Sequence, residues 1–186
     1  MQNKIEVPTY SECMALLSKY GMPKNIVAHC ATVSKIAVFI AERINARGGT
    51  VNVSLVCAAA LLHDIDKIIE IKNKSGKHGS MAREILEKEG YPEVAKIAEN
   101  HVLHKIIKEG ASFSIEEKIV FYADKRVKHD KIVSLSERFE YLRERYPHHL
   151  ENVNRAEPLT KNLEKELMDA AGIRADEITD ASIGNV

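Results

Sequence analysis

Apolar residues recur at helical intervals along most of the chain. Between Pro23 and Gly48, isoleucine and valine side chains return every three, four or seven residues, which places them on one face of a helix. Proline favours the first turn of a helix and glycine commonly follows the last, so a long helix is expected between these two residues. After Asn52 the run LVCAAALLHD is apolar almost throughout, which predicts a helix that is buried on most sides.

Capping signals mark the other helices. Thr9 with Glu12, and Ser114 with Glu117, have the spacing of a capping box at a helix start. Glycine or proline bounds most of the remaining apolar runs, where a helix would end or begin. The predicted helices are 10–19, 23–47, 53–64, 81–90, 92–104, 115–127, 134–145 and 159–171.

These elements predict an all-α fold in one compact domain. The chain has 186 residues, of which 45% are apolar, and this length and composition suit a single core. The polar stretch 72–77 is typical of an exposed loop, and the residues after Gly172 are expected to form a loosely held tail. We expect residues 1–22 to form an N-terminal helix with its lead-in, 23–146 the main domain, and 147–186 a C-terminal helix and tail that pack on the same domain.

Charge, cysteine content and the N-terminus narrow the range of partners. Lysine and arginine balance aspartate and glutamate at 27 each, so no global field attracts nucleic acid or an anionic membrane. Cys13, Cys30 and Cys57 form no C-x-x-C pair, and they are expected to be reduced, mostly buried thiols. No basic segment precedes an apolar run, and no stretch approaches the roughly 20 apolar residues that span a bilayer. We therefore expect a cytoplasmic protein with a small-molecule partner and with neither a membrane nor a nucleic-acid partner.

Histidine and aspartate occupy positions on the apolar faces of the predicted helices. His29 lies on the long apolar stripe, His63 and Asp64 end the most apolar helix, and Asp124 is on the buried face of a later one. An ionised group in an apolar interior costs free energy unless it is paired or bound to a metal. A single histidine there is more often hydrogen-bonded in the core, but the four residues together offer two imidazole nitrogens and two carboxylates to one divalent cation.

The order of these residues resembles the H…HD…D pattern of the HD superfamily, and LLHDIDK is similar to its HDIG variant. The resemblance covers residues 20–145 and implies an HD domain with a metal site in its helical core. In that family the four motif residues ligate a metal that activates water against phosphoester or phosphoanhydride bonds. The resemblance therefore implies that His29, His63, Asp64 and Asp124 hold a divalent ion.

Two further histidines raise the possible number of ions to two. Some HD families, including diadenosine-tetraphosphate hydrolases and cyclic-di-GMP phosphodiesterases, are similar to this chain in having two more histidines before the final aspartate. His78 and His101 occupy comparable positions, and Asp64 would then bridge the two ions. The phosphodiesterases also carry paired histidines and a GYP segment, whereas this chain has His101-Val102 and no GYP, so cyclic-di-GMP hydrolysis is disfavoured. Mixed nitrogen and oxygen ligation suits Fe, Mn, Ni, Co, Zn or Mg, at one or two ions per chain.

Residues beside the motif have competing interpretations. Lys67 matches a lysine that follows the motif in similar members, where it is suited to neutralising a scissile phosphate, although it can equally be an ordinary surface lysine. With Asp64, which would position the ions and accept a proton, it forms the predicted catalytic pair. Asp66 stands where HDIG has glycine, and it either supports the ligands or is a solvated aspartate at a helix end. His104 is either a substitute ligand, a substrate contact or a rim residue.

The other charged residues near these segments are expected to be solvated. His129 and the pair His148-His149 lie in highly charged stretches, and nothing in the sequence ties them to the cluster. Lys125 and Arg126 follow Asp124 directly and could meet substrate phosphates. Because adjacent helical residues point about 100° apart, surface ion pairs are the expected role for both.

The predicted function is metal-dependent hydrolysis of a phosphoester or phosphoanhydride bond by metal-activated water. The substrate class is expected to be a nucleotide or dinucleoside polyphosphate; whether the enzyme is a phosphomonoesterase, phosphodiesterase or pyrophosphohydrolase stays open, as does homodimer formation. One alternative is a non-catalytic HD module that binds nucleotide or metal as a sensor. Another is a helical interaction domain whose histidines are core hydrogen-bonding groups. The sequence has no Gly-rich phosphate loop, no H-E-x-x-H and no G-x-S-x-G motif to favour other catalytic classes.

Overall fold

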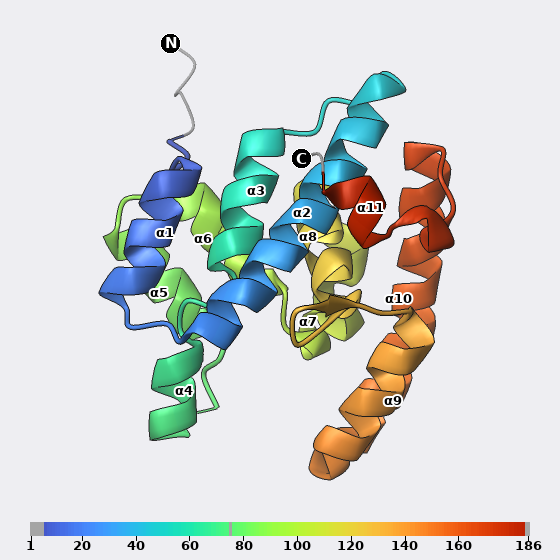
Figure 1. Cartoon of the computed structure of the whole chain (residues 1–186). Coiled ribbons are helices and arrows are strands. Elements are labelled where there is room, and N and C mark those ends of the chain that lie inside the picture. Colours follow the sequence, from blue (N-terminus) through green and yellow to red (C-terminus); the bar gives the residue numbers. More distant parts are fainter. Residues whose placement is uncertain (1–5, 75, 185–186) are drawn as a thin grey trace.

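Helices account for almost all of the regular structure (Figure 1). The computed structural model describes residues 6–74 and 76–184 of the chain. The predicted all-α fold is confirmed, because the β structure within these residues is confined to one short antiparallel pair. The elements are, in chain order, α1 (Tyr10–Lys19), α2 (Lys24–Ala46), α3 (Val53–Leu62), α4 (Lys67–Asn73), α5 (Ser80–Lys88), α6 (Pro92–Asn100), α7 (Leu103–Glu109), η1 (Gly110–Ser112), α8 (Ile115–Lys125), β1 (Val127–Lys128), β2 (Lys131–Ile132), α9 (Leu135–Arg145), η2 (Pro147–His149), α10 (Leu150–Ala171), η3 (Ala175–Glu177) and α11 (Asp180–Ile183).

Three helices, α2, α3 and α8, form the centre of the molecule. α2 packs against both α3 and α8, and these two also contact each other. The apolar stripe of α2 is fully buried at Val33, Ile36 and Ile40. Burial of such side chains is the main favourable contribution to folding, so the apolar pattern of the sequence explains why these helices meet.

Side-chain caps begin the helices where the sequence predicts them. Thr9 and Glu12 form a capping box at the start of α1, and Ser114 and Glu117 form another at the start of α8. The side chain of Asn52 accepts a hydrogen bond from a backbone amide in the first turn of α3. These caps satisfy amide groups that have no partner inside the helix, and they confirm the predicted helix starts.

The outer helices cover the central three from two sides (Figure 1). α5 and α6 pack against each other, and α6 contacts both α3 and α8. On the other side, α10 contacts α2, α7, α8 and α9. The division of the chain into residues 1–22, 23–146 and 147–186 remains a prediction.

Two separate helices, α6 and α7, replace the single helix that was predicted over 92–104. α6 ends at Asn100, and Val102 is extended with ψ 144°. The carbonyl oxygen of His101 accepts a hydrogen bond from the buried Lys125 Nζ (2.9 Å) and no longer takes part in a helix. The prediction that His101 and His104 share one helical face is therefore wrong: His101 is buried and His104 is exposed.

The C-terminal helix and tail also differ from the prediction. α10 begins at Leu150 and continues through Pro158, whereas the sequence predicted a start at 159. Val153 and Ala156 are buried on the same stripe as the later leucines, so packing before the proline outweighs the helical hydrogen bond that proline removes. Residues 173–184 are not the loosely held tail that was predicted, because Ile178 and Ile183 are buried in the core and α11 packs against α2. The last two residues of the predicted tail lie outside the described residues.

The segment between α3 and α5 contains a helix that the sequence analysis did not predict. α4 extends to Asn73, so the predicted exposed loop 72–77 begins later than expected, and residue 75 within it lies outside the described residues. Lys74 ends α4 in the left-handed conformation, with φ 50°. α3 ends at Leu62, two residues earlier than predicted, which leaves His63 and Asp64 in the turn that leads to α4.

By length and composition α2 is also apolar enough to cross a membrane, with a mean hydropathy of 1.3. The expectation that no segment comes near this requirement is thereby corrected. However, 61% of its most apolar window is buried inside the protein, and a core helix meets the same criterion. The expected cytoplasmic location and the absence of a membrane partner remain predictions.

Candidate metal centre

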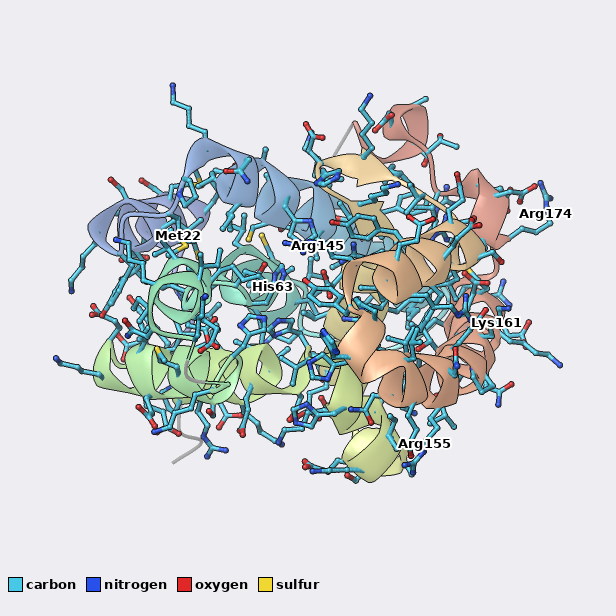
Figure 2. All side chains as sticks on the ribbon, turned by 90° about the horizontal axis from the view of Figure 1, so that it is seen from below. Met22, His63, Arg145, Arg155, Lys161 and Arg174 are labelled. Atoms are coloured by element: carbon cyan, nitrogen blue, oxygen red, sulfur yellow. The ribbon has the colours of Figure 1, made fainter. Side chains whose placement is uncertain are left out.

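His63 occupies the end of the most deeply buried helix. Its ring is fully buried, and Figure 2 shows it inside the molecule, whereas Lys161 and Arg174 extend outward at the periphery. Nδ1 donates a hydrogen bond to the carbonyl oxygen of Ala60 (2.7 Å), because a carbonyl can only accept. Among the described residues Nε2 has no hydrogen-bond partner, although it is buried. A buried nitrogen lone pair without a partner is costly and needs an explanation.

His29 approaches the same point from α2. Its Nδ1 donates to the carbonyl oxygen of His129 (2.7 Å), and its Nε2 lies 3.1 Å from Oδ1 of Asp124. His129 adopts φ 58° in the turn between β1 and β2, and its side chain is exposed as predicted. The expectation that nothing ties His129 to the cluster is corrected, because its backbone carbonyl accepts a hydrogen bond from the His29 ring.

His78 and His101 face each other across Asp64. Nδ1 of His101 donates to the carbonyl of Ala98 (2.5 Å), and Nδ1 of His78 donates to Oδ1 of Asp66 (2.8 Å). The two Nε2 atoms are 3.0 Å apart, and they lie 3.2 Å (His78) and 3.4 Å (His101) from Oδ1 of Asp64. When both rings are neutral, two Nε2 lone pairs face each other at this distance, and a cation between them would satisfy both.

The four histidines share one arrangement that suits a metal. Each donates its Nδ1 hydrogen to a fixed acceptor, which leaves the Nε2 lone pair directed at the carboxylates; partners of this kind orient the histidine ligands of metal sites. Neutral imidazole with carboxylate is a donor set typical of divalent transition metals. The ligand atoms within each of two groups lie within 4.8 Å of one another, and Asp64 belongs to both groups. The groups are His29, His63 and Asp64, and Asp64, His78 and His101.

The structure therefore brings all six predicted ligands together. Asp124 lies beside the first group, with Oδ1 3.8 Å from Nε2 of His63 in addition to its contact with His29. The assignment of these side chains as metal ligands remains a prediction, which the donor set and the unpartnered His63 Nε2 support.

Burial and neighbouring charges set the ionisation of the cluster. Burial lowers the pKa of His63 to about 3, although Asp64 acts in the opposite direction. Burial would raise the pKa of Asp64, but Lys67 and His63 outweigh it and hold that pKa well below its usual range. For His78, burial lowers the pKa, yet its hydrogen bonds to Asp64 and Asp66 prevail and raise it to about 9. His63 and Asp64 thus have the protonation states that metal binding requires, whereas a proton competes for His78.

Asp66 supports His78 and does not face solvent. Its side chain is fully buried, which rules out the solvated aspartate at a helix end. Oδ1 accepts from His78, and Oδ2 accepts from the amides of Gly79 (2.8 Å) and Ala82 (3.2 Å) at the start of α5. Gly79 has φ 87°, and a Cβ there would lie only 3.0 Å from the carbonyl oxygen of Glu99, so this turn requires glycine. One carboxylate therefore orients a predicted ligand and caps the next helix.

Lys67 lies at the open side of the cluster. Its side chain is 31% exposed, and Nζ is 3.4 Å from Oδ1 of Asp64 and 3.2 Å from Nε2 of His78. Burial acts against its charge, but Asp64 outweighs burial and raises the pKa of Lys67, which keeps the side chain protonated. Its position fits the predicted contact with a phosphate, and that role remains a prediction.

Lys125 and Arg126 are buried, and the expectation of surface ion pairs is wrong for both. Nζ of Lys125 contacts the carboxylate of Asp124 and also donates to His101, so it joins α8 to the break after α6. Arg126 uses its three nitrogens on three acceptors: Nε donates to the Val133 carbonyl (2.7 Å), Nη1 to the Tyr122 hydroxyl (2.6 Å) and Nη2 to the Ala175 carbonyl (3.1 Å). Acceptors from distant segments could not be foreseen from helical geometry alone.

A cleft of about 1140 Å³ opens onto the cluster. Its walls come from α4, α7, α9 and the start of α10, and exposed His104 and His149 lie among its lining residues. His148 is exposed and is not among them. Sequence reasoning missed Arg138, which projects from α9 into this cleft. Its position three residues after Leu135 and four before Leu142 places it on an apolar stripe, which was the available signal.

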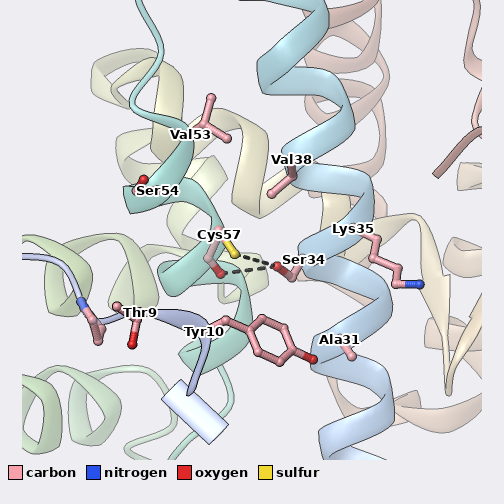
Figure 3. A pocket seen from close by; sticks show the side chains of 10 residues that line it. Thr9, Tyr10, Ala31, Ser34, Lys35, Val38, Val53, Ser54 and Cys57 are labelled. Carbon is pink, nitrogen blue, oxygen red and sulfur yellow. Dashed lines mark hydrogen bonds between the residues drawn. The ribbon is translucent and has the colours of Figure 1, made fainter. Parts of the chain in front are cut away.

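A second, smaller hollow lies between α1, α2 and α3 (Figure 3). It has a volume of about 450 Å³, and among the described residues none of the predicted ligands lines it. Ser34 Oγ donates to the carbonyl of Cys57 (3.3 Å) and contacts its sulfur (3.4 Å). Cys13 and Cys30 are buried, Cys57 is half-buried, and all three are free thiols as predicted.

Comparison with known proteins places this site within a family. A model of the HD domain family matches residues 26–127, which is more than half of the chain. An uncharacterized protein of Methanocaldococcus jannaschii is 35% identical over 133 residues, a match that covers 62% of this chain and 77% of that protein.

Two longer relatives carry a different name. A tRNA (cytidine(56)-2'-O)-methyltransferase of Picrophilus torridus is 30% identical over 185 residues, which cover 93% of this chain and 50% of the relative. A protein of the same name from Thermoplasma volcanium is 32% identical over 143 residues, 70% of this chain and 40% of the relative. The chain thus spans half or less of the length of these two methyltransferases.

No solved structure matches the chain at a significant level. The family match includes His29, His63, Asp64, His78, His101 and Asp124. It suggests metal-dependent hydrolase activity, and the histidine and aspartate groups described above could hold the metal. Because the HD domain model matches more than half of its length, this chain belongs to the HD domain family.

Proposed function

We propose that this protein is a metal-dependent phosphohydrolase that cleaves a phosphoester or phosphoanhydride bond of a nucleotide or dinucleoside polyphosphate. The observation that carries the proposal is the convergence of four imidazole Nε2 atoms on Asp64 and Asp124, each ring fixed through its Nδ1 hydrogen. A site prepared in this way to receive cations stands at the base of a cleft that is open to a substrate.

The residues of the cluster have distinct parts in the proposed reaction. A bound divalent ion supplies Lewis-acid stabilisation of a phosphoryl oxygen and lowers the pKa of water. Asp64 belongs to both ligand groups, so it would hold both ions in place, and its low pKa favours this positioning over storage of a proton. Lys67 stays charged beside Asp64 and can donate hydrogen bonds to a phosphate oxygen as negative charge develops there.

The size and charge of the cleft support a nucleotide-like substrate. Small-molecule pockets usually have volumes of about 300–1,000 Å³, so the cleft can accept a ligand with more than one phosphate and a base. Tyr146 is exposed at its wall and offers a ring on which a base could stack. Cationic side chains line the cleft, namely Lys67, Lys74, Lys108, Lys125, Arg138 and Arg145.

The methyltransferase name of two relatives is not carried over to this chain. Those proteins are at least twice as long as the segment that matches them. The proposal rests on the HD site, which lies within the part that this chain shares with the Picrophilus torridus relative, since that match covers 93% of this chain. The expected absence of a nucleic-acid partner also stays a prediction.

A metal and substrate screen tests the proposal. Purified protein is stripped of metal, reloaded with Mn, Co, Ni or Mg, and assayed against aryl phosphates, nucleotides and dinucleoside polyphosphates for phosphate release. We expect turnover that depends on the added metal. A protein that binds metal and nucleotide without turnover would instead be a sensor, and one that binds no metal would be a helical interaction domain.

A further inference from the structure

Arg138 lies beside the metal centre and belongs to none of the predicted ligands. Its Nη2 is 4.0 Å from Oδ1 of Asp124, the carboxylate that also contacts His29. The side chain is only 13% exposed, and it lines the cleft. Arg138 comes from α9, beyond the residues 26–127 that match the family, so it is a contribution of the rest of the chain.

Within the described residues, the hydrogen-bonding capacity of this guanidinium is not used. Nε of Arg138 is buried and has no hydrogen-bond partner, and its contact with Asp124 exceeds hydrogen-bond distance. Arg126 shows the opposite case, because all three of its nitrogens donate to protein acceptors at 2.6–3.1 Å. A guanidinium has five hydrogens to donate, and leaving the buried Nε–H without an acceptor costs free energy. The hydrogen bonds of Arg126 join segments of the fold. The guanidinium of Arg138 can instead donate hydrogen bonds to a ligand in the cleft.

The position of Arg138 is fixed by its helix. Ser134 and Glu137 form a capping box at the start of α9, and Phe139 anchors the helix in the core. The guanidinium lies 5.5 Å from the centroid of the Tyr141 ring, which is a cation–π contact. The planar guanidinium of Arg138 is thus held at the wall of the cleft, next to the predicted ligand Asp124.

Asp124 does not need Arg138 for charge balance. Lys125 contacts the same carboxylate, and the His29 ring lies against it. Lys67 comes from α4 and lies beside Asp64, the carboxylate that both ligand groups share. Arg138 and Lys67 therefore approach the cluster from different helices, one beside Asp124 and the other beside Asp64.

We propose that Arg138 binds the phosphate of the substrate, with its guanidinium on the phosphate oxygens opposite Lys67. This inference rests on the proposed function, because it takes the ligand of the cleft to be a phosphorylated compound. The chemical class recognised is a phosphate dianion at the metal centre, which planar guanidinium groups bind in a bidentate manner. The recognition holds for a phosphomonoester and for the terminal phosphate of a nucleotide alike.

Binding of inorganic phosphate tests the assignment without turnover. The dissociation constant is measured by isothermal titration for the wild type, Arg138→Gln, Arg138→Lys and the control Arg143→Gln, each metal-stripped and Mn-loaded. Arg143 lies on the same helix but is already engaged by Asn154 and Glu157. We expect Arg138→Gln to weaken phosphate binding about 10- to 100-fold and Arg138→Lys to weaken it less. A lysine keeps the positive charge but loses the paired donors that bind a phosphate in a bidentate manner. The control should bind as the wild type does.

Metal content separates this role from a structural one. Arg138→Gln and Arg138→Lys should both keep the wild-type amount of bound manganese, since Arg138 is no ligand. Wild-type phosphate affinity in Arg138→Gln, or loss of manganese from both variants, would overturn the assignment. If the wild type hydrolyses no phosphoester while Arg138→Gln still loses phosphate affinity, the proposed function fails and the phosphate site stands.

Discussion

The two ligand groups that share Asp64 differ in the segments that carry their histidines and in the groups that orient the rings. In the first group, the Nδ1 atoms of His29 and His63 donate to backbone carbonyls, and both histidines belong to or end central helices. In the second group, His78 lies in the loop before α5, is 25% exposed, and is oriented by the side chain of Asp66. The two main-chain acceptors, Ala60 in α3 and His129 in the turn between β1 and β2, move only with the backbone, whereas a loop histidine held by another side chain can change its orientation more easily.

Because of this difference, the two candidate positions should bind ions with unequal affinity. The first group is complete once the central helices have packed and the turn between β1 and β2 holds His29, and its His63 is neutral at any pH near 7. The second depends on Asp66, on the turn at Gly79 and on the break after Asn100 that places His101. We therefore expect a tightly held first ion and a weaker second ion.

The largest effect is expected from the residue that the groups share. Asp64→Ala removes a carboxylate from both positions and leaves Lys67 without its main counter-charge. We expect loss of nearly all bound metal and a fall in turnover of about a thousandfold or more. Mass-spectrometric metal analysis and a phosphate-release assay measure both, with exposed Asp169→Ala as the control. Full activity and full metal content in Asp64→Ala would refute the assignment.

His78→Ala should separate the two positions. It removes a ligand of the second group alone, so we expect one ion to be lost and one to be kept, with turnover reduced about a hundredfold. Titration of metal-stripped protein with Mn counts the ions, and His148→Ala is the matched histidine control because it is exposed and outside the cleft lining. Retention of two ions, or loss of both, would contradict the division into two groups.

Asp66→Asn should weaken the second position without emptying it. The amide keeps the shape of the carboxylate but loses the charge that fixes the Nδ1 hydrogen of His78. We expect the affinity for the second ion to fall about 10- to 100-fold, and excess metal should restore activity. The weaker cap of α5 should lower the free energy of unfolding by about 1 kcal/mol, measured by denaturant titration. An unchanged affinity for the second ion would leave Asp66 with a purely structural role.

The smallest effect concerns pH. Because the pKa of His78 is raised to about 9, the ring is protonated below that pH in metal-free protein, and the second ion must displace a proton. Its affinity should therefore fall by up to about tenfold for each pH unit below 9. His63, with a pKa of about 3, should stay neutral over the same range. Nitrogen NMR of the imidazoles in metal-free protein reports both, and a His78 that is already neutral at pH 7 would contradict the expected competition.

Much of the fold and of the candidate site could be predicted because the signals are local. Helical periodicity placed His29 and Asp124 on buried faces, and the capping boxes at Thr9 and Ser114 located two helix starts. A polar residue on an apolar stripe is visible in the sequence alone, since only spacing is needed to find it. The resemblance to the HD pattern then predicted that residues far apart in the sequence share one site, which periodicity alone cannot show.

The rest could not be predicted because it depends on contacts between distant segments. The helix break after Asn100 follows from a hydrogen bond that Lys125 donates from α8. The burial of Asp66 depends on the return of the chain at Gly79, and Pro158 stays inside α10 because neighbouring side chains pack before it. Arg138 carried a periodic signal, but its meaning depends on the cleft that α9 borders.

Crystals grown with manganese and measured at its absorption edge test the central claim most directly. We predict anomalous peaks between the Nε2 atoms and the two carboxylates, with the stronger peak at His29, His63 and Asp124 and the weaker one at His78 and His101. Folded protein with saturating manganese and no anomalous peak at these side chains would contradict the metal centre.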